Sequence, residues 1–179
     1  MRPDRIASGF AVPAFDDVAA LPELLRIEVP ARFQDANGHM SATRYLTTSV
    51  AGVEEALDRL GIPRDWPTRA GLGVFTVDQH LHFLSEVTVG STLTFHCRML
   101  SRAERSGQLV GYLLDHDRRS ICFVIEASFV HVRMDTRRAA VWPAIVATAL
   151  DGWVAEHAAL PWPVGTSPCL GGRATRGNG

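Results

Sequence analysis

One carboxylate, one amide, one glycine and one imidazole lie within five residues near the start of the chain. They are Asp35, Asn37, Gly38 and His39, and Met40 follows directly. A carboxylate or an imidazole can act as a base, and backbone N–H groups at a turn or a helix start can stabilise developing negative charge. These residue types at this spacing therefore offer a base and a site for developing negative charge side by side.

The same residues are equally consistent with a turn that does no chemistry. Asn-Gly is among the strongest turn dipeptides, because both residues accept positive φ. In that interpretation Asp35 satisfies backbone amides of the turn, and His39 is a partly buried polar group whose hydrogen bonds are made. The residues alone give the two interpretations about equal support.

The residues after this turn predict a long helix from Ala42 to Leu60. Ser41 is a suitable N-cap, and Gly61 followed by Pro63 is a strong stop signal. Apolar residues recur at steps of three and four, which corresponds to one face of an α-helix. We expect this stripe to pack in the core; it consists of Leu46, Val50, Val53, Leu57 and Leu60.

Strand-like runs precede and follow this helix. One covers residues 25–32, and four more cover residues 73–86, 92–100, 108–115 and 120–134. The short polar links at 89–91, 104–107 and 116–119 are typical of hairpins, so we predict a four-strand antiparallel meander. In the run 73–86, alternation places Phe75, Val77, Leu81 and Phe83 on one face, and Thr76, Asp78, His80 and His82 on the other.

This order of elements predicts an α+β fold in which one long central helix is wrapped by a curved antiparallel sheet. We divide the chain into an N-terminal extension at 1–24, a helix-and-sheet domain at 25–143, a C-terminal helix at 144–160 and a flexible tail at 161–179. The apolar residues of the C-terminal helix are Ile145, Val146, Leu150 and Val154. Polar strand faces and open sheet edges favour pairing of two copies into a dimer.

Composition excludes several classes of function. The net charge of −1 gives no electrostatic footprint for nucleic acid. No apolar run reaches the roughly 20 residues of a membrane span, and the first residues do not resemble a signal peptide. Cys97, Cys122 and Cys169 lack metal or redox spacing. We expect a cytoplasmic protein with reduced cysteines and no nucleic-acid or membrane partner.

The run from Asp35 to Met40, followed by Arg44-Tyr45-Leu46, resembles the motif that opens the central helix of hotdog-fold acyl-CoA thioesterases of the 4-hydroxybenzoyl-CoA thioesterase type. Residues 75–90 resemble the second strand of that family. Residues 126–143 are similar to the last strand and exit of a narrower subgroup, which includes betainyl-CoA thioesterases and the thioesterase part fused to carnitine dehydrogenases. The resemblance covers about residues 27–142 and implies the hotdog fold.

The resemblance also implies an activity and a set of catalytic residues. The expected reaction is hydrolysis of a short or polar acyl-CoA, possibly similar to betainyl-CoA, to the free acid and coenzyme A. Asp35 matches the position of the catalytic carboxylate, which acts as general base or nucleophile. Asn37 would orient the water or the carbonyl, and Gly38 would let the acyl group approach the backbone. The N–H groups of Gly38, His39 and Met40 would stabilise the oxyanion, and the His39 side chain would position groups.

Further residues are assigned to substrate binding. Met40, Tyr45, Thr76, Asp78 and His80 are expected there, although Tyr45 also suits the core. His80 and His82 have metal-compatible spacing, but nothing else completes a ligand set, so no metal is expected. Family members are dimers or tetramers of dimers with sites between subunits, and the resemblance implies no cofactor besides the coenzyme A of the substrate.

Arginines on or next to the predicted hairpins are candidates for contact with the phosphates of coenzyme A, because guanidinium groups bind phosphate well. The prediction covers Arg98, Arg102 and Arg105, and Arg118 and Arg119 have similar positions. In the competing interpretation, these arginines form a solvated rim and bind no ligand.

Two other functions stay open at this level. Hotdog hydratases and dehydratases use an Asp-x-Asn-Pro-x-His arrangement, and the chain departs from it by lacking the proline and by placing His39 one residue nearer. A non-catalytic acyl-CoA-binding hotdog protein is the other alternative. A hydrolase releases thiol, a hydratase consumes enoyl absorbance without releasing thiol, and a binding protein does neither.

Overall fold

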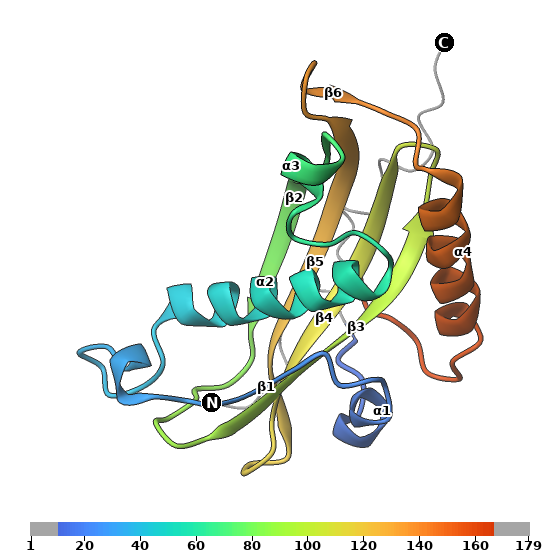
Figure 1. Ribbon diagram of the computed structural model, residues 1–179. Coiled ribbons are helices and arrows are strands. Elements are labelled where there is room, and N and C mark those ends of the chain that lie inside the picture. Colours follow the sequence, from blue (N-terminus) through green and yellow to red (C-terminus); the bar gives the residue numbers. More distant parts are fainter. Residues whose placement is uncertain (1–10, 167–179) are drawn as a thin grey trace.

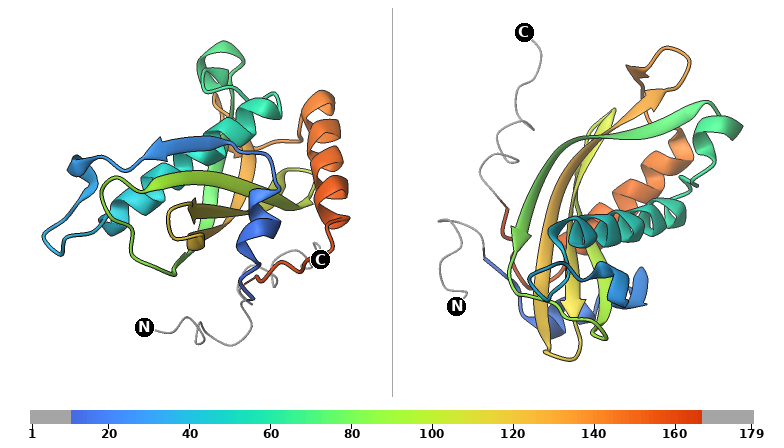
Figure 2. Two further views of the ribbon diagram at one scale, coloured as in Figure 1. Left: turned by 90° about the horizontal axis from the view of Figure 1, so that it is seen from below. Right: turned by 90° about the vertical axis from the view of Figure 1, so that its left-hand side faces the viewer.

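A curved antiparallel sheet surrounds one long helix in the computed structural model, which describes residues 11–166 (Figure 1). In chain order the elements are α1 (Phe15–Ala19), β1 (Leu25–Glu28), the 3-10 turn η1 (Ala31–Phe33), α2 (Ala42–Arg59), α3 (Trp66–Arg69), β2 (Leu72–Phe83), β3 (Thr92–Arg102), β4 (Ser106–Asp115), β5 (Ser120–Arg133), β6 (Arg138–Ala139) and α4 (Ala144–Ala158). Figure 2 shows α2 lying in the hollow of the sheet. The predicted fold class is confirmed.

The strand order differs from the predicted meander. All pairs are antiparallel, and the order is β1-β3-β4-β5-β2, with β6 beside β5. Strands β3, β4 and β5 follow one another through short hairpins, as predicted, but β2 pairs with β5 and ends the sheet. Residues 84–91 therefore carry the chain across the molecule and form no hairpin. The alternation within β2 predicts a strand, but it contains nothing that selects the neighbour.

Helix α2 contacts the sheet through small residues, and the predicted aliphatic stripe is wrong in part. Its buried residues are Tyr45, Thr48, Ser49, Gly52 and Ala56. Of the predicted stripe, Leu60 is buried, but Val50 is exposed and the other three are half-buried. At the closest approach, a Cβ added to Gly52 would overlap the ring of Phe95 on β3. Aliphatic side chains are too large for this contact, so they pack at its sides.

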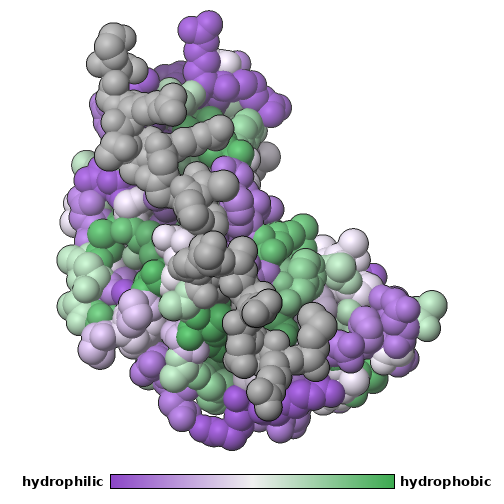
Figure 3. All heavy atoms as spheres, turned by 180° about the vertical axis from the view of Figure 1, so that it is seen from behind, coloured by the Kyte–Doolittle hydropathy of each residue, from purple (hydrophilic) through white to green (hydrophobic). Residues whose placement is uncertain are grey.

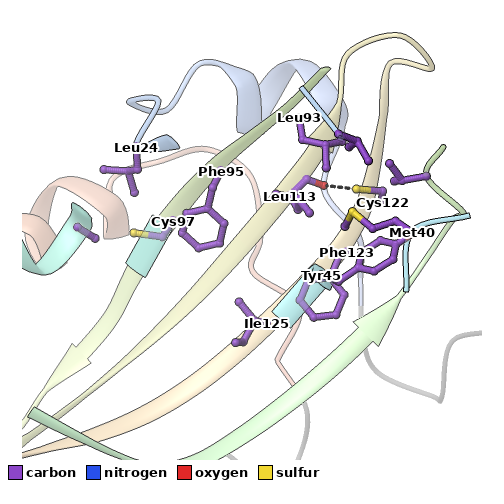
Figure 4. Packing of buried hydrophobic residues seen from close by; sticks show 13 residues of the cluster. Leu24, Met40, Tyr45, Leu93, Phe95, Cys97, Leu113, Cys122, Phe123 and Ile125 are labelled. Atoms are coloured by element: carbon purple, nitrogen blue, oxygen red, sulfur yellow. Dashed lines mark hydrogen bonds between the residues drawn. The ribbon is translucent and has the colours of Figure 1, made fainter. Parts of the chain in front are cut away.

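The core between α2 and the sheet holds the chain on both sides of the turn in place. Figure 4 shows Met40 and Tyr45 lying against Phe123 of β5. Leu93 and Phe95 belong to the same buried cluster. Burial of these side chains is the main stabilising contribution at the start of α2. The turn that precedes the helix is thus fixed to the end of the sheet.

A β-bulge in β2 corrects the predicted division of its two faces. The register with β5 shifts between Thr76 and Asp78, which leaves Val77 as the extra residue. Opposite residues of an antiparallel pair project to one face. Thr76 lies opposite Phe129 on the side of α2, and Asp78 lies opposite Ser128 on the other side. The strict alternation predicted from the sequence therefore does not continue through the bulge.

The outer face of the sheet, opposite to α2, is covered by α1 and by residues 160–166. Val18, Tyr112, Val124 and Trp162 form a cluster there, and Figure 3 shows this side with apolar and polar residues interspersed. Residues 161–166, predicted as part of a flexible tail, are packed through Trp162. The rest of that tail and residues 1–10 of the predicted N-terminal extension lie outside the described residues.

Two smaller predictions concern α4 and the cysteines. Of the apolar residues named for this helix from the sequence, Val146 and Leu150 are buried, whereas Ile145 is 82% exposed. Cys97 and Cys122 are free and buried, and burial raises the pKa of the Cys97 thiol to about 12. Cys169 lies outside the described residues. Within residues 11–166 no helix has both the length and the apolar character of a membrane span.

Candidate active site

The run with mixed chemistry forms a tight turn between η1 and α2. The N–H of Asp35 donates to the carbonyl of His39 at 3.0 Å, and the N–H of Gly38 donates to the carbonyl of Asp35 at 3.1 Å. Gly38 has a φ of +86°, which only glycine adopts without strain. Gln34 and Met40 form an isolated antiparallel bridge on either side. The predicted turn is confirmed, together with its glycine.

The Asp35 carboxylate stabilises this turn directly. Its Oδ1 accepts a hydrogen bond from the Asn37 N–H at 2.8 Å, and its Oδ2 lies 3.5 Å from Asn37 Nδ2. This is the Asx-turn geometry in which a short side chain replaces a backbone acceptor. Asp35 is half-buried. One carboxylate oxygen is therefore committed to the turn, and the other has only a long contact.

A cavity of about 530 Å³ opens beside the turn at the start of α2. One wall comes from His39 and Met40 and from the first residues of α2. The opposite wall comes from the end of β2 and the segment after it, and Arg118 reaches the cavity from the β4–β5 hairpin. Asp35 is not among the lining residues. The lining consists of His39, Met40, Ala42, Tyr45, Phe83, Leu84, Ser85, Glu86 and Arg118.

Tyr45 connects the two walls of the cavity. Its hydroxyl donates to the carbonyl of Ser85 at 3.1 Å, and its ring meets the Phe83 ring edge-on with 5.5 Å between centroids. Phe83 in turn lies 4.9 Å from Phe123. Burial raises the pKa of Tyr45 to about 12, so the hydroxyl stays protonated and keeps its role as a donor. Tyr45 is thus both core and cavity wall.

Unpaired backbone N–H groups lie on the helix side of this cavity. The N–H of Gly38 is bonded within the turn, and that of Met40 donates to the Val87 carbonyl at 2.8 Å. The His39 N–H has no main-chain partner among the described residues. Ser41 occupies the N-cap position without a side-chain hydrogen bond to the helix, and its carbonyl accepts the Arg44 N–H at 2.8 Å, so the N–H groups of Ala42 and Thr43 have no main-chain partner among the described residues. These groups, with the positive end of the α2 dipole, favour an anion.

The titratable side chains at the cavity are few. His39 Nε2 lies 4.0 Å from Glu86 Oε1, and the Glu86 side chain is 78% exposed. Such an exposed pair is weak, because solvent screens it. Both groups border the cavity and can reach a bound ligand.

The predicted substrate-binding residues of β2 are not brought to this cavity within a single chain. Asp78 and His80 lie on the outer face of the edge strand, opposite Ser128 and Glu126. Thr76 lies on the face of α2 and is exposed. His82, which shares the outer face, bonds to the buried Glu126 at 2.8 Å. Among residues 11–166, no cluster of three or more His, Cys, Asp or Glu side chains is suited to a metal.

The three arginines predicted to bind coenzyme A do not line the cavity of the single chain. Arg98 is buried, stacks 4.1 Å from the Trp162 ring centroid and donates to the carbonyls of Trp162 and His157. Arg102 forms two hydrogen bonds of 2.6 Å with Asp151 of α4. Arg105 lies 3.9 Å from Glu104. None of the three lines the cavity, whereas Arg118 does.

The chain matches a known protein family. Residues 29–150 match the family model described as the thioesterase-like superfamily. The L-carnitine dehydrogenase/betainyl-CoA thioesterase of Agrobacterium fabrum is 31% identical over 117 residues, which are 65% of this chain and 24% of that protein. This chain thus spans about a quarter of that relative. The betainyl-CoA thioesterase of Pseudomonas aeruginosa is 24% identical over 76% of this chain and 86% of its own length.

A solved structure shares the fold. It is a hypothetical protein from Staphylococcus aureus in complex with CoA, and it aligns with a TM-score of 0.73 at 19% identity. The alignment covers 80% of this chain and 90% of that one. At this identity the likeness establishes the fold alone.

Proposed function

Because this chain belongs to the thioesterase-like superfamily, we propose that it is an acyl-CoA thioesterase, which cleaves a short or polar acyl-CoA into the free acid and coenzyme A. The observation that supports this most is the cavity at the start of α2, which places a helix N-terminus beside a turn that carries an acid and an imidazole. Thioester hydrolysis needs a nucleophile and a sink for the charge on the carbonyl oxygen, and both kinds of group are present.

The proposed charge sink is the set of unpaired N–H groups at the helix start. The N–H groups of His39, Ala42 and Thr43 are oriented by the turn and the helix before the substrate binds, whereas the Arg44 N–H is already bonded to the Ser41 carbonyl. Donors that need no reorganisation stabilise a developing oxyanion most strongly. Gly38 and Met40, whose N–H groups are bonded in the structure, then support the geometry of the turn.

The proposed base or nucleophile is Asp35. Its Oδ1 is held by the Asn37 N–H, which fixes the orientation of the carboxylate and leaves Oδ2 with a 3.5 Å contact only. Since Asp35 does not line the cavity of the single chain, the proposal requires that the complete site extend past the turn. Asn37 would then orient the water or the carbonyl, and His39 would line the acyl site.

The second copy that completes the site is proposed to pair along β2. This strand ends the sheet, because only β5 lies beside it among the described residues. Val77, Leu81 and Phe83 of β2 are 58%, 36% and 51% exposed. Exposed apolar residues on a long edge strand favour pairing with an identical edge. A homodimer, alone or within a tetramer of dimers, follows, and it would place Thr76, Asp78 and His80 at the interface.

The acyl group is proposed to be betainyl-like. The two relatives carry betainyl-CoA thioesterase in their names. In this chain the cavity presents the edge-to-face rings of Tyr45 and Phe83 together with the carboxylate of Glu86. Aromatic faces and a carboxylate are the groups that bind a quaternary ammonium.

The test is a panel of acyl-CoA substrates that includes betainyl-CoA, butyryl-CoA and crotonyl-CoA, with a thiol-detecting reagent as readout. The proposal predicts thiol release, fastest for a short or polar acyl group. Loss of crotonyl absorbance without thiol release would instead indicate a hydratase. Binding of acyl-CoA without turnover on any member would indicate a non-catalytic acyl-binding protein.

A further inference from the structure

Arg118 is the one guanidinium that lines the cavity among residues 11–166. It follows β4 in the hairpin that leads to β5, and it is far in sequence from the turn at residues 35–40. The neighbouring Arg119 points away: its guanidinium bonds Asp16 at 2.7 Å and lies 5.0 Å from the Phe15 ring centroid. The hairpin therefore supplies one cation to the cavity and one to α1.

A buried carboxylate fixes Arg118 in place. Asp115 is fully buried, and its Oδ1 accepts hydrogen bonds from the N–H groups of Asp117 and Arg118 at 3.0 and 3.1 Å. Its Oδ2 accepts the Arg118 Nη1–H at 3.0 Å. One acid thus holds both the backbone and the side chain of Arg118. A guanidinium held in this way loses little freedom when a ligand binds.

Part of the guanidinium remains free for a ligand. Beyond Asp115, Nη1 donates to the Glu86 carbonyl at 3.2 Å and Nη2 donates to Thr88 Oγ1 at 3.3 Å. An arginine has five N–H groups, so these three hydrogen bonds leave two without a partner among the described residues, the Nε–H among them. The side chain is 44% exposed. Paired N–H groups on one guanidinium suit a planar or tetrahedral oxyanion.

The neighbouring carboxylates of Glu86 and Asp117 form no ion pair with Arg118. The Glu86 carboxylate lies toward His39, at 4.0 Å, and offers Arg118 only its backbone carbonyl. Asp117 accepts the Thr92 N–H at 2.7 Å through Oδ2. The cavity therefore combines one fixed guanidinium, one imidazole and an exposed carboxylate.

We propose that Arg118 is a substrate-binding residue that holds an oxyanion of the thioester substrate. This inference rests on the proposed function, and it names the anchoring charge of the same cavity. The oxyanion is either a phosphate of the coenzyme A moiety, which betainyl-CoA also carries, or a carboxylate on the acyl group, which would replace the betainyl-like acyl group proposed above. Arg98, Arg102 and Arg105 do not line the cavity: Arg98 and Arg102 are bound to other groups, and Arg105 is exposed beside Glu104.

The experiment measures binding of free coenzyme A by calorimetry, and KM for butyryl-CoA and succinyl-CoA. Arg118→Gln keeps an N–H donor for Asp115 but removes the charge, and Arg118→Lys keeps the charge but not the paired donors. Arg119→Gln is the matched control, since it removes the neighbouring cation on the same hairpin. Thermal unfolding of each variant verifies the fold.

If a phosphate is the ligand, Arg118→Gln weakens coenzyme A binding about tenfold or more and raises KM for both substrates, Arg118→Lys shows an intermediate loss, and Arg119→Gln stays within about twofold. If the acyl carboxylate is the ligand, coenzyme A binding is unchanged and KM rises for succinyl-CoA alone. Unchanged binding and unchanged KM in a folded Arg118→Gln protein overturn the inference. Wild-type protein that neither binds coenzyme A nor cleaves any member of the acyl-CoA panel overturns the proposed function, and the inference with it.

Discussion

The carboxylate of Asp35 accepts a hydrogen bond from the turn that Asp35 begins. A suitable variant can therefore separate this structural role from the proposed chemical role. The Asn37 N–H needs an acceptor at Oδ1, and the side-chain oxygen of an asparagine supplies one equally well. A proton acceptor or nucleophile, in contrast, needs the negative charge. Asparagine at position 35 should therefore preserve the turn and remove the proposed chemistry.

Substitution of Asp35 by alanine would remove both the turn contact and the proposed chemical role. We expect Asp35→Ala to lower the free energy of unfolding by about 1 kcal/mol, because the Asn37 N–H loses its acceptor. Asp35→Asn should stay within about 0.5 kcal/mol of wild type. Urea unfolding measures both variants. Equal stability of the alanine and asparagine variants would contradict the turn-stabilising role.

Close packing between helix α2 and the sheet depends on glycine. A Cβ at Gly52 would overlap the Phe95 ring, and the same ring covers Gly111 of β4. We expect Gly52→Ala to destabilise the protein by about 1–3 kcal/mol, although alanine is the better helix former. Gly152→Ala in α4 is the control, since its Cβ meets open space, and it should stabilise by about 0.5–1 kcal/mol. Thermal unfolding of both variants measures these effects. A stabilised Gly52→Ala would show that the contact between Gly52 and Phe95 leaves room for a methyl group.

The elements themselves were largely predictable, and their contacts were not. The bounds of α2 follow from local signals, the helical period and the Gly61 stop. The face that α2 buries was missed, because hydrophobicity ranks Gly52 and Ser49 below Val50, whereas close approach favours small residues. The bulge at Val77 and the pairing of β2 with β5 depend on partners distant in sequence. For the same reason the turn of the site was predicted, but its facing wall was not.

At the scale of the whole molecule, we expect the free energy of unfolding to depend on pH through two buried histidines. Burial lowers the pKa of His96 and of His157 below the ordinary 6.5. Below pH 6.5 the unfolded chain then binds protons that the folded chain does not. The contribution of these two histidines to the free energy of unfolding is therefore greatest above pH 6.5 and falls as the pH drops below it. Chemical denaturation between pH 5 and 8 measures this, and His157→Asn should flatten the slope; a stability that rises on acidification would contradict it.

The second prediction for the whole molecule concerns its oligomeric state. Val77→Lys places a charge on the exposed edge of β2, so we expect it to convert the proposed dimer into monomers. Ile145→Lys is the control, because Ile145 is more exposed but lies on α4. Light scattering after size exclusion gives both masses. A monomeric wild type, or a dimer that persists in Val77→Lys, would remove the pairing along β2.

The most direct test of the proposed chemistry is the kcat for thiol release from the best acyl-CoA substrate, compared between wild type and Asp35→Asn. The account predicts that the variant folds with wild-type stability and loses about 100-fold or more in kcat, because the charge of the carboxylate is gone while the turn remains. An Asp35→Asn enzyme that releases thiol as fast as wild type would contradict it.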